Sequence, residues 1–163
     1  DSKSADTPRR ANRRLLMERL EQSVARAHRY EERVGVILVD VDDFKRINDL
    51  AGHSTGDRIL VEMADRLRQG VRACDTVARL EGDTFAVLLP ELESAGAAEP
   101  VATKILSILH QPLVQPSPRS ALGASLGIAT YPDDAGNADG LLRAADARLL
   151  RAKRRGGQRI ERA

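Results

Sequence analysis

The sequence predicts an α+β domain in which a central, mostly antiparallel sheet is flanked by helices. Apolar segments at 76–80 and 85–89, separated by a glycine-containing turn, have the form of a β-hairpin. Another buried strand is expected at 34–40, and helical periodicity recurs before and after these strands. Hairpins mixed with helices favour this fold class. With 163 residues, the chain is expected to form one domain over 12–163, after a flexible basic segment at 1–11.

The first half of the chain opens with a helix expected over about 12–32. Its apolar stripe consists of Leu16, Leu20, Val24 and Ala27. The strand at 34–40 follows as an unbroken apolar run. The next helix is expected to be capped by Ser54 or Thr55, with Asp57 in its favourable first turn.

The second half of the chain continues the alternation of helices and strands. Pro90 is expected to end the hairpin, because proline cannot donate to a sheet ladder. A helix at about 101–109 leads into a proline-rich loop, and another strand is expected at 121–130. The last helix is expected to end at Gly156, before a terminal strand near 158–160.

The composition limits the classes of protein to which this chain can belong. The single cysteine, Cys74, cannot form an internal disulfide and is expected to be buried, which suits a reducing cytoplasm. No apolar run reaches about 18 residues, so this domain is expected to be cytoplasmic without membrane contact, within a larger multidomain or membrane-attached protein. Two Phe, two Tyr and no Trp offer few stacking platforms, so nucleic acid is not an expected partner.

The segment at 36–49 runs from a buried strand into clustered carboxylates. Asp40 and Asp42 are two residues apart on an extended segment and are expected to share one face, where they repel unless a cation lies between them. Such oxygen ligands suit Mg²⁺, which commonly accompanies a nucleotide phosphate. If the strands are neighbours, Asp83 of the hairpin joins the same cation. The alternative is a strand that turns polar as it reaches the surface.

Several motifs follow one another in a fixed order. They are Asp40-Val-Asp-Asp-Phe-Lys-Arg-Ile-Asn-Asp49, Gly52-His53 with Gly56-Asp57, Arg79-Leu-Glu-Gly-Asp-Thr-Phe85, and Ala145-Asp146 with Ala152-Lys153. In this order and spacing, from about Leu15 to Ile160, the chain resembles the GGDEF domain of diguanylate cyclases. The resemblance implies a nucleotide-cyclase-like fold. It also implies a reaction that condenses two GTP into cyclic di-GMP, with each domain of a homodimer supplying half of the site.

The resemblance assigns metal and guanine roles by position. Asp40 would bind Mg²⁺ through its side chain, Val41 through its carbonyl, and Asp83 as the second carboxylate. Asn48 and Asp57 match the groups that hydrogen-bond guanine. Mg²⁺ is therefore the expected cofactor when GTP is bound.

Phosphate and catalytic roles follow in the same way. Lys45 and Lys153 match the cations on the phosphate side, and Gly82 matches a nucleotide-binding glycine of the signature hairpin. If the domain is active, the resemblance makes Asp83 and Lys45 its catalytic residues. Phosphoryl transfer depends mostly on positioning and electrostatics, which suits such residues.

The signature hairpin departs from the family pattern at two positions. Glu81 replaces a glycine and is expected to bring bulk and negative charge toward a triphosphate. Thr84 replaces a carboxylate, and losing a general base typically costs on the order of 100- to 10,000-fold in rate. A third departure is Gly157, where the family pattern has a phosphate-facing arginine.

One further motif is intact. Arg72 and Asp75 lie where active family members carry an Arg-x-x-Asp site that binds the product, and the arginine is nine residues ahead of the hairpin signature. Such residues can recognise the edge of guanine. Lys104 is close to where the family often adds another basic residue to this site. Without the resemblance, the pair would be interpreted as a surface ion pair.

These observations favour a cyclic di-GMP receptor or regulatory module with a degraded active site. The alternative is an active or slow diguanylate cyclase that uses GTP. A homodimer is expected, in which the ligand could bridge two copies. Two further interpretations stay open: an interaction domain that binds no nucleotide, and nonspecific nucleic-acid binding through arginine.

Overall fold

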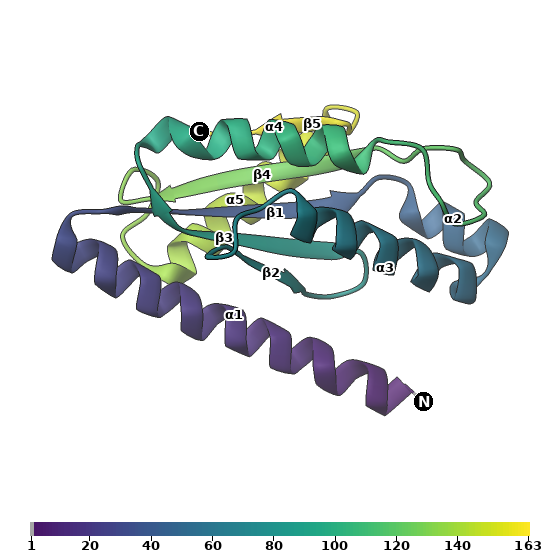
Figure 1. Cartoon of the computed structure of the whole chain (residues 1–163), viewed down its shortest axis with the longest axis horizontal. Coiled ribbons are helices and arrows are strands. Elements are labelled where there is room, and N and C mark those ends of the chain that lie inside the picture. The colour runs from purple at the N-terminus through teal and green to yellow at the C-terminus, as the bar shows by residue number, and fades with distance from the viewer. Residues whose placement is uncertain (1) are drawn as a thin grey trace.

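A five-stranded sheet runs through the middle of the molecule in the order β2-β3-β1-β4-β5 (Figure 1). Its strands are β1 (Arg33–Val41), β2 (Thr76–Arg79), β3 (Thr84–Leu92), β4 (Ala124–Tyr131) and β5 (Arg159–Glu161). Only β5 pairs in parallel, with β4; the other three pairs are antiparallel. This computed structural model describes the backbone of residues 2–163 and the side chains of 12–163. The predicted fold class is confirmed.

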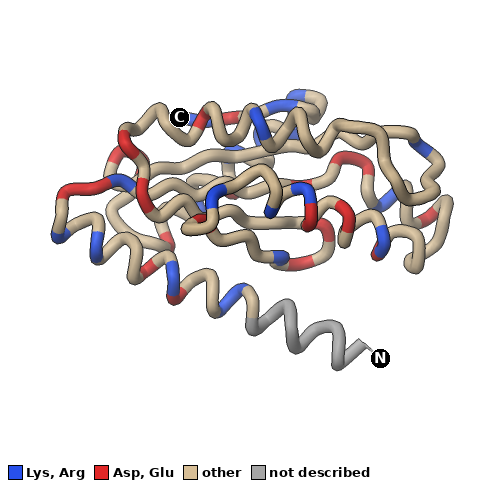
Figure 2. The backbone as a smooth tube through the Cα atoms, in the orientation of Figure 1, with Lys and Arg blue, Asp and Glu red and all other residues tan. Residues whose placement is uncertain are grey.

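Helices cover both faces of the sheet (Figure 1). They are α1 (Ser2–Tyr30), α2 (Phe44–Ala51), α3 (His53–Gln69), α4 (Ala98–Leu109) and α5 (Ala138–Arg154), with a short 3-10 turn, η1 (Ala95–Ala97). Among the residues that the structure describes, no helix is long and apolar enough to cross a membrane. Lys and Arg are interspersed with Asp and Glu along the helices and loops (Figure 2).

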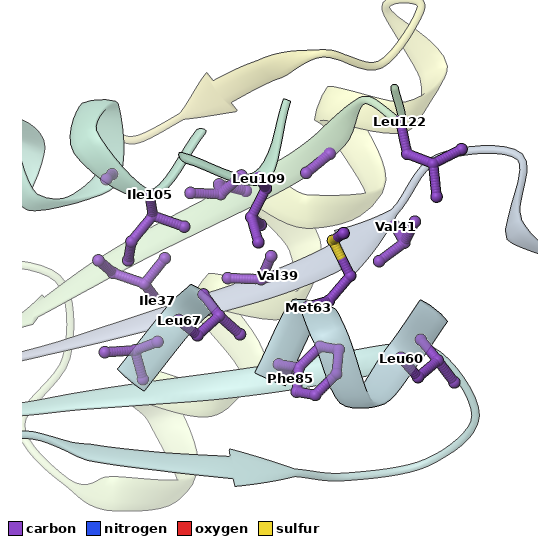
Figure 3. Packing of buried hydrophobic residues seen from close by; sticks show 14 of the residues in the cluster. Ile37, Val39, Val41, Leu60, Met63, Leu67, Phe85, Ile105, Leu109 and Leu122 are labelled. Carbon is purple, nitrogen blue, oxygen red and sulfur yellow. The ribbon is translucent and has the colours of Figure 1, made fainter. Parts of the chain in front are cut away.

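Alternating residues of the central strand divide the core into two layers. Ile37 and Val39 pack with residues of α3 and α4, including Met63, as Figure 3 shows. Val36 and Leu38 pack on the opposite face with residues of α1 and α5. A strand buried on both faces explains the unbroken apolar run in the sequence.

The termini of several elements differ from the expectations. Helix α1 begins at Ser2. The prediction of a flexible basic segment at 1–11 falls on residues whose side chains the structure does not describe, so it stays a prediction. Helix α3 has Gly52 as its N-cap and no side-chain cap, so the prediction that Ser54 or Thr55 caps it is wrong. Asp57 accordingly lies beyond the first turn.

Strand β3 continues through Pro90 to Leu92 instead of ending at the proline. The register between β1 and β3 shifts between Arg33 and Gly35, opposite the segment that contains Pro90. A bulge tolerates proline because one residue there makes no ladder hydrogen bond.

Candidate functional site

The end of β1 lies beside the signature hairpin. Asp40 is the register partner of Thr84 on β3 and of Ser125 on β4. The hairpin turn itself is closed by a hydrogen bond from the Thr84 amide to the Glu81 carbonyl, at 3.0 Å. The sheet therefore brings the first carboxylate motif next to the hairpin, as the sequence predicts.

A cavity of about 360 Å³ opens at this end of the sheet. It is lined by Val41, Asp42, Asp43, Phe44, Lys45, Asp83, Lys153, Gly156 and Gly157. These residues come from the β1–α2 junction, the hairpin and the end of α5. Three motifs that are far apart in the sequence thus share one cleft.

Asp40 is 3% exposed and forms an ion pair with the Lys153 ammonium of α5. Its other oxygen, Oδ1, is buried and has no hydrogen-bond partner among the described residues. Burial lowers the pKa of Lys153. An unpartnered buried carboxylate oxygen is costly and suits a position that a cation completes.

The oxygen donors here fit Mg²⁺. Asp40 supplies the unpartnered oxygen, and Val41, which has a backbone carbonyl, and Asp83, a second carboxylate, are among the residues that line the cleft. Burial raises the pKa of Asp83, and the positive charge of Arg79 partly offsets this. Within the described residues, no group of three or more His, Cys, Asp or Glu side chains could hold a metal ion. A Mg²⁺ ion here would therefore need the carbonyl and ligand oxygens as well.

Asp42 also lines the cleft, and its carboxylate already has partners within the protein. Its carboxylate accepts hydrogen bonds from the Ser125 hydroxyl at 2.6 Å and the Gln158 amide at 2.7 Å. A Cβ on Gly157 would lie 2.7 Å from the same carboxylate, so this position has little room for a side chain. Ser125 of β4 and the backbone amide of Gln158, just before β5, thus satisfy the Asp42 carboxylate, and a cation shared with Asp40 stays a prediction.

Asn48 and Asp57 lie where α2 meets α3. The Asn48 Oδ1 atom is buried and lacks a hydrogen-bond partner in the described part of the chain. It lies so close to Gly56 that a Cβ there would be 1.7 Å away, which explains why glycine occupies this position. Asp57 follows directly and is exposed. An unsatisfied amide oxygen beside an exposed carboxylate suits a base with several donors.

The signature hairpin borders two cavities: Asp83 lines the first, and Glu81 and Thr84 line a second. Glu81 is 83% exposed at its side chain and forms an ion pair with Arg13 of α1, at 3.6 Å. Both Glu81 and Thr84 line a separate cavity of about 300 Å³ between α1 and α5, with Leu16 among its apolar walls. Arg13 of α1 thus offsets part of the Glu81 charge, and the expectation that Glu81 brings negative charge toward a triphosphate stays a prediction.

The Arg-x-x-Asp motif forms a tight turn before β2. Asp75 is 1% exposed at its side chain, and its carboxylate accepts hydrogen bonds from the Arg72 amide at 2.8 Å and Nη2 at 3.2 Å. Arg72 Nη2 also donates to the Glu91 carbonyl at 2.9 Å. The hydrogen bond that Arg72 donates to Asp75 raises the pKa of Arg72, against the opposing effect of burial. The Arg72 side chain remains 55% exposed, so its guanidinium is held by hydrogen bonds on a side chain that is open to solvent.

Neighbouring residues leave this turn accessible. Cys74 is exposed, so the prediction that it is buried is wrong, because the turn points its side chain outward. Lys104 is exposed on α4, and that helix packs against the end of α3.

Two arginines near the clefts make ion pairs that the sequence does not predict. Arg13 pairs with Glu81, and Arg119 donates to Asp43 at 3.1 Å across a separation of 76 residues. Periodicity and motif spacing describe local order, so they cannot reveal pairs that only the tertiary fold creates.

Comparison with known proteins places this geometry in a family. The family model described as "Diguanylate cyclase, GGDEF domain" matches residues 9–159. The bifunctional diguanylate cyclase/cyclic di-GMP phosphodiesterase MucR of Pseudomonas aeruginosa is 43% identical over 145 residues, which is 89% of this chain and 21% of MucR. The diguanylate cyclase TpbB of the same organism is 40% identical over 91% of this chain and 35% of TpbB. The chain thus spans about a fifth to a third of these relatives.

Solved structures agree with the sequence matches. The crystal structure of the TpbB GGDEF domain has a TM-score of 0.89 at 36% identity, covering 93% of this chain and 94% of that one. The GGDEF domain of DgcB from Caulobacter crescentus, in complex with c-di-GMP, has a TM-score of 0.79 at 25% identity, covering 89% and 86%. The protein therefore belongs to the GGDEF domain family of diguanylate cyclases.

Proposed function

We propose that this domain is a cyclic di-GMP-binding regulatory module whose former synthesis cleft still accepts GTP but turns it over slowly or not at all. The observation that carries the proposal is the geometry of the Arg-x-x-Asp turn. The Asp75 side chain is buried and fixes the Arg72 guanidinium, while the Arg72 side chain as a whole stays 55% exposed. The crystal structure of a structural neighbour, the GGDEF domain of DgcB, is of its complex with c-di-GMP.

Recognition of guanine would use this prearranged guanidinium. Arginine donates to O6 and N7 of guanine or stacks on its face, and a fixed side chain loses little conformational entropy on binding. Asp75 acts here as a positioning residue because Arg72 already occupies its carboxylate. Lys104 would add positive charge for the phosphates of the ligand.

The synthesis cleft keeps its binding residues and lacks part of its catalytic set. Lys45 and Lys153 would attract the triphosphate, and Asn48 and Asp57 would hold the guanine. Mg²⁺, held by Asp40, Val41 and Asp83, would neutralise phosphate charge when it is bound. At position 84, a threonine cannot take a proton from the attacking hydroxyl as a carboxylate would.

Isothermal titration with cyclic di-GMP tests the receptor function. The parent protein is expected to bind, and Arg72→Ala is expected to abolish the heat of binding. Arg68→Ala is a matched control, because Arg68 also forms an exposed i,i+3 ion pair, with Asp65 at 3.1 Å. Absence of binding by the folded parent protein would contradict the receptor proposal.

A second candidate, a slow diguanylate cyclase, rests on the orientation of Glu81. Glu81 pairs with Arg13 and is not among the residues that line the cleft of Asp83 and Lys45, so its charge there is partly offset. Steady formation of cyclic di-GMP from GTP, lost in Asp83→Ala, would establish this function.

We also propose that cyclic di-GMP can bridge two copies of the domain. The ligand has two equivalent guanines, so a symmetric dimer could present Arg72 from each copy. Sedimentation with and without ligand is expected to show a ligand-dependent dimer, and a monomer under both conditions would count against bridging.

A further inference from the structure

Asp43 occupies an unusual position between β1 and α2. It is the N-cap residue of α2, yet its backbone is left-handed, with φ 57° and ψ 21°, and its side chain makes no capping hydrogen bond. An aspartate at an N-cap ordinarily accepts a hydrogen bond from the first free amides of its helix. The Asp43 carboxylate therefore has another partner that holds it.

That partner is Arg119, in the loop between α4 and β4. Its Nη1 donates to Asp43 Oδ2 at 3.1 Å, and the two side chains are 45% and 54% exposed. Asp43 is one of the residues that line the cleft at the end of β1, whereas Arg119 is not among them and contacts Asp43 from outside the cleft. An exposed ion pair of this kind contributes little to the stability of the protein. Its effect on the cleft is that Arg119 offsets the negative charge of Asp43.

The loop that carries Arg119 is anchored at both ends. At its start, Arg66 and Glu62 of α3 form an ion pair, 12% and 11% exposed, at 2.6 Å. Arg66 donates to the carbonyls of Ile108, Leu109, Gln111 and Pro112, and Glu62 accepts from the amides of Val114 and Gln115. At its end, the Gly123 carbonyl accepts from the Asp42 amide at 2.9 Å. Arg119 is thus presented to Asp43 from a fixed segment.

The charge of the cleft makes this contact consequential. Its lining contains three carboxylates, Asp42, Asp43 and Asp83, and two cations, Lys45 and Lys153. Lys153 is already paired with Asp40, and Gly157 supplies no cation. A triphosphate entering such a cleft is repelled by each carboxylate that lacks a counter-charge.

We propose that Arg119 is a positioning residue for the triphosphate of GTP. It neutralises Asp43 and holds that carboxylate away from the free amides at the start of α2, so that the phosphates can occupy the space beside Lys45. This inference rests on the proposed ability of the cleft to accept GTP. It assigns a role to a loop residue outside the motifs of the domain.

The test is a double-mutant cycle on Arg119 and Asp43, read by binding of the α,β-methylene analogue of GTP with Mg²⁺. Arg119→Ala is expected to weaken binding roughly threefold to tenfold, because it exposes one uncompensated charge near the phosphates. Arg119→Lys keeps the charge and is expected to retain most of the affinity. The double variant Arg119→Ala/Asp43→Asn is expected to bind within about twofold of the parent protein, because no carboxylate remains to compete.

The matched control is the same cycle on Arg68 and Asp65, an exposed ion pair of equal length on α3 that does not line the cleft. It changes the same charges and is expected to leave binding of the analogue unaltered. Thermal unfolding of every variant checks that each one is folded.

Two outcomes would overturn the inference. If the double variant binds as weakly as Arg119→Ala, Arg119 acts directly on the phosphates or through loop structure, and not through Asp43. If the parent protein does not bind the analogue at all, the inference fails while the titration with cyclic di-GMP still tests the receptor function separately.

Discussion

Buried aspartates held by arginines occur at two places in this domain, and they serve different purposes. Asp75 fixes a guanidinium that remains exposed, whereas Arg148, the partner of Asp134, is only 15% exposed. Asp134 also accepts hydrogen bonds from the amide and hydroxyl of Thr130, at 2.8 and 3.1 Å. The first arrangement presents a donor to solvent, and the second joins α5 to β4.

Replacing Asp134 by alanine is expected to destabilise the protein by about 3 kcal/mol, because it leaves the nearly buried Arg148 without its partner. Burial raises the pKa of Asp134, but the hydrogen bonds from Arg148 and Thr130 outweigh it and lower that pKa overall. This stabilisation is therefore complete above the unfolded value of about 3.9 and is lost as pH falls through the lower folded pKa.

Urea unfolding between neutral and acidic pH measures this effect. The control is Asp133→Ala, because the adjacent Asp133 pairs with Arg33 in an exposed ion pair at 3.1 Å and should contribute about 1 kcal/mol or less. Equal losses in both variants would contradict the assigned role of Asp134.

The two changes in the signature hairpin are expected to have unequal effects on turnover. Glu81→Gly should leave the rate nearly unchanged, because Arg13 of α1 already offsets the Glu81 charge. Thr84→Glu should raise the rate on the order of 100-fold, because it restores a carboxylate on the register partner of Asp40. Cyclic di-GMP formed from GTP is the measurement, and a gain in Glu81→Gly alone would show that Glu81 does obstruct the cleft.

At the scale of elements, the segment between α5 and β5 contains Gly157, where the family pattern has a phosphate-facing arginine. The structure of this segment explains why that arginine cannot simply be restored. Gly157 has φ +74°, and a Cβ there would lie 2.7 Å from Asp42 Oδ2. Asp42 in turn is held by Ser125 and Gln158. An arginine at this position would disturb the junction of β1, β4 and β5.

Gly157→Arg is accordingly expected to destabilise the protein by about 1–3 kcal/mol without strengthening nucleotide binding. The control is Gly136→Arg, since Gly136 has open space around its Cβ position and should change stability by about 0.5 kcal/mol or less. Chemical denaturation distinguishes the two variants. Tighter GTP binding by a fully stable Gly157→Arg would contradict the assigned role of this glycine.

The sequence predicts the elements that have strong local signals. The apolar run of β1 and the glycine turn of the hairpin are sufficient to place Asp40 and Asp83 at one end of the sheet. Helix α2 is missed because it has eight residues, of which only Phe44 and Ile47 are buried, which is too few for a helical period to be recognised. The pairing of Arg119 with Asp43 is missed because it depends on where a long loop returns to the sheet.

At the scale of the whole molecule, the β2–β3 hairpin connects the two candidate sites. The Arg72–Asp75 turn immediately precedes β2, and the residues from Glu81 to Asp83 closely follow it. Arg72 also contacts the far end of β3 through the Glu91 carbonyl. Because β2 has four residues, the sites lie at opposite ends of a segment only about 13 Å long.

Under the proposed function, this arrangement would let one domain combine product recognition with a weakened synthesis cleft. The exposed guanidinium of Arg72 is fixed by the fold itself, while the cleft depends on groups such as Thr84 that no longer carry the expected charge. The decisive experiment is incubation of the purified protein with GTP and Mg²⁺, followed by chromatography of the products and of any nucleotide released from the denatured protein. Negligible turnover together with recovery of bound cyclic di-GMP is the expected result. Steady accumulation of cyclic di-GMP that Asp83→Ala abolishes would contradict the proposed loss of turnover and establish a working cyclase.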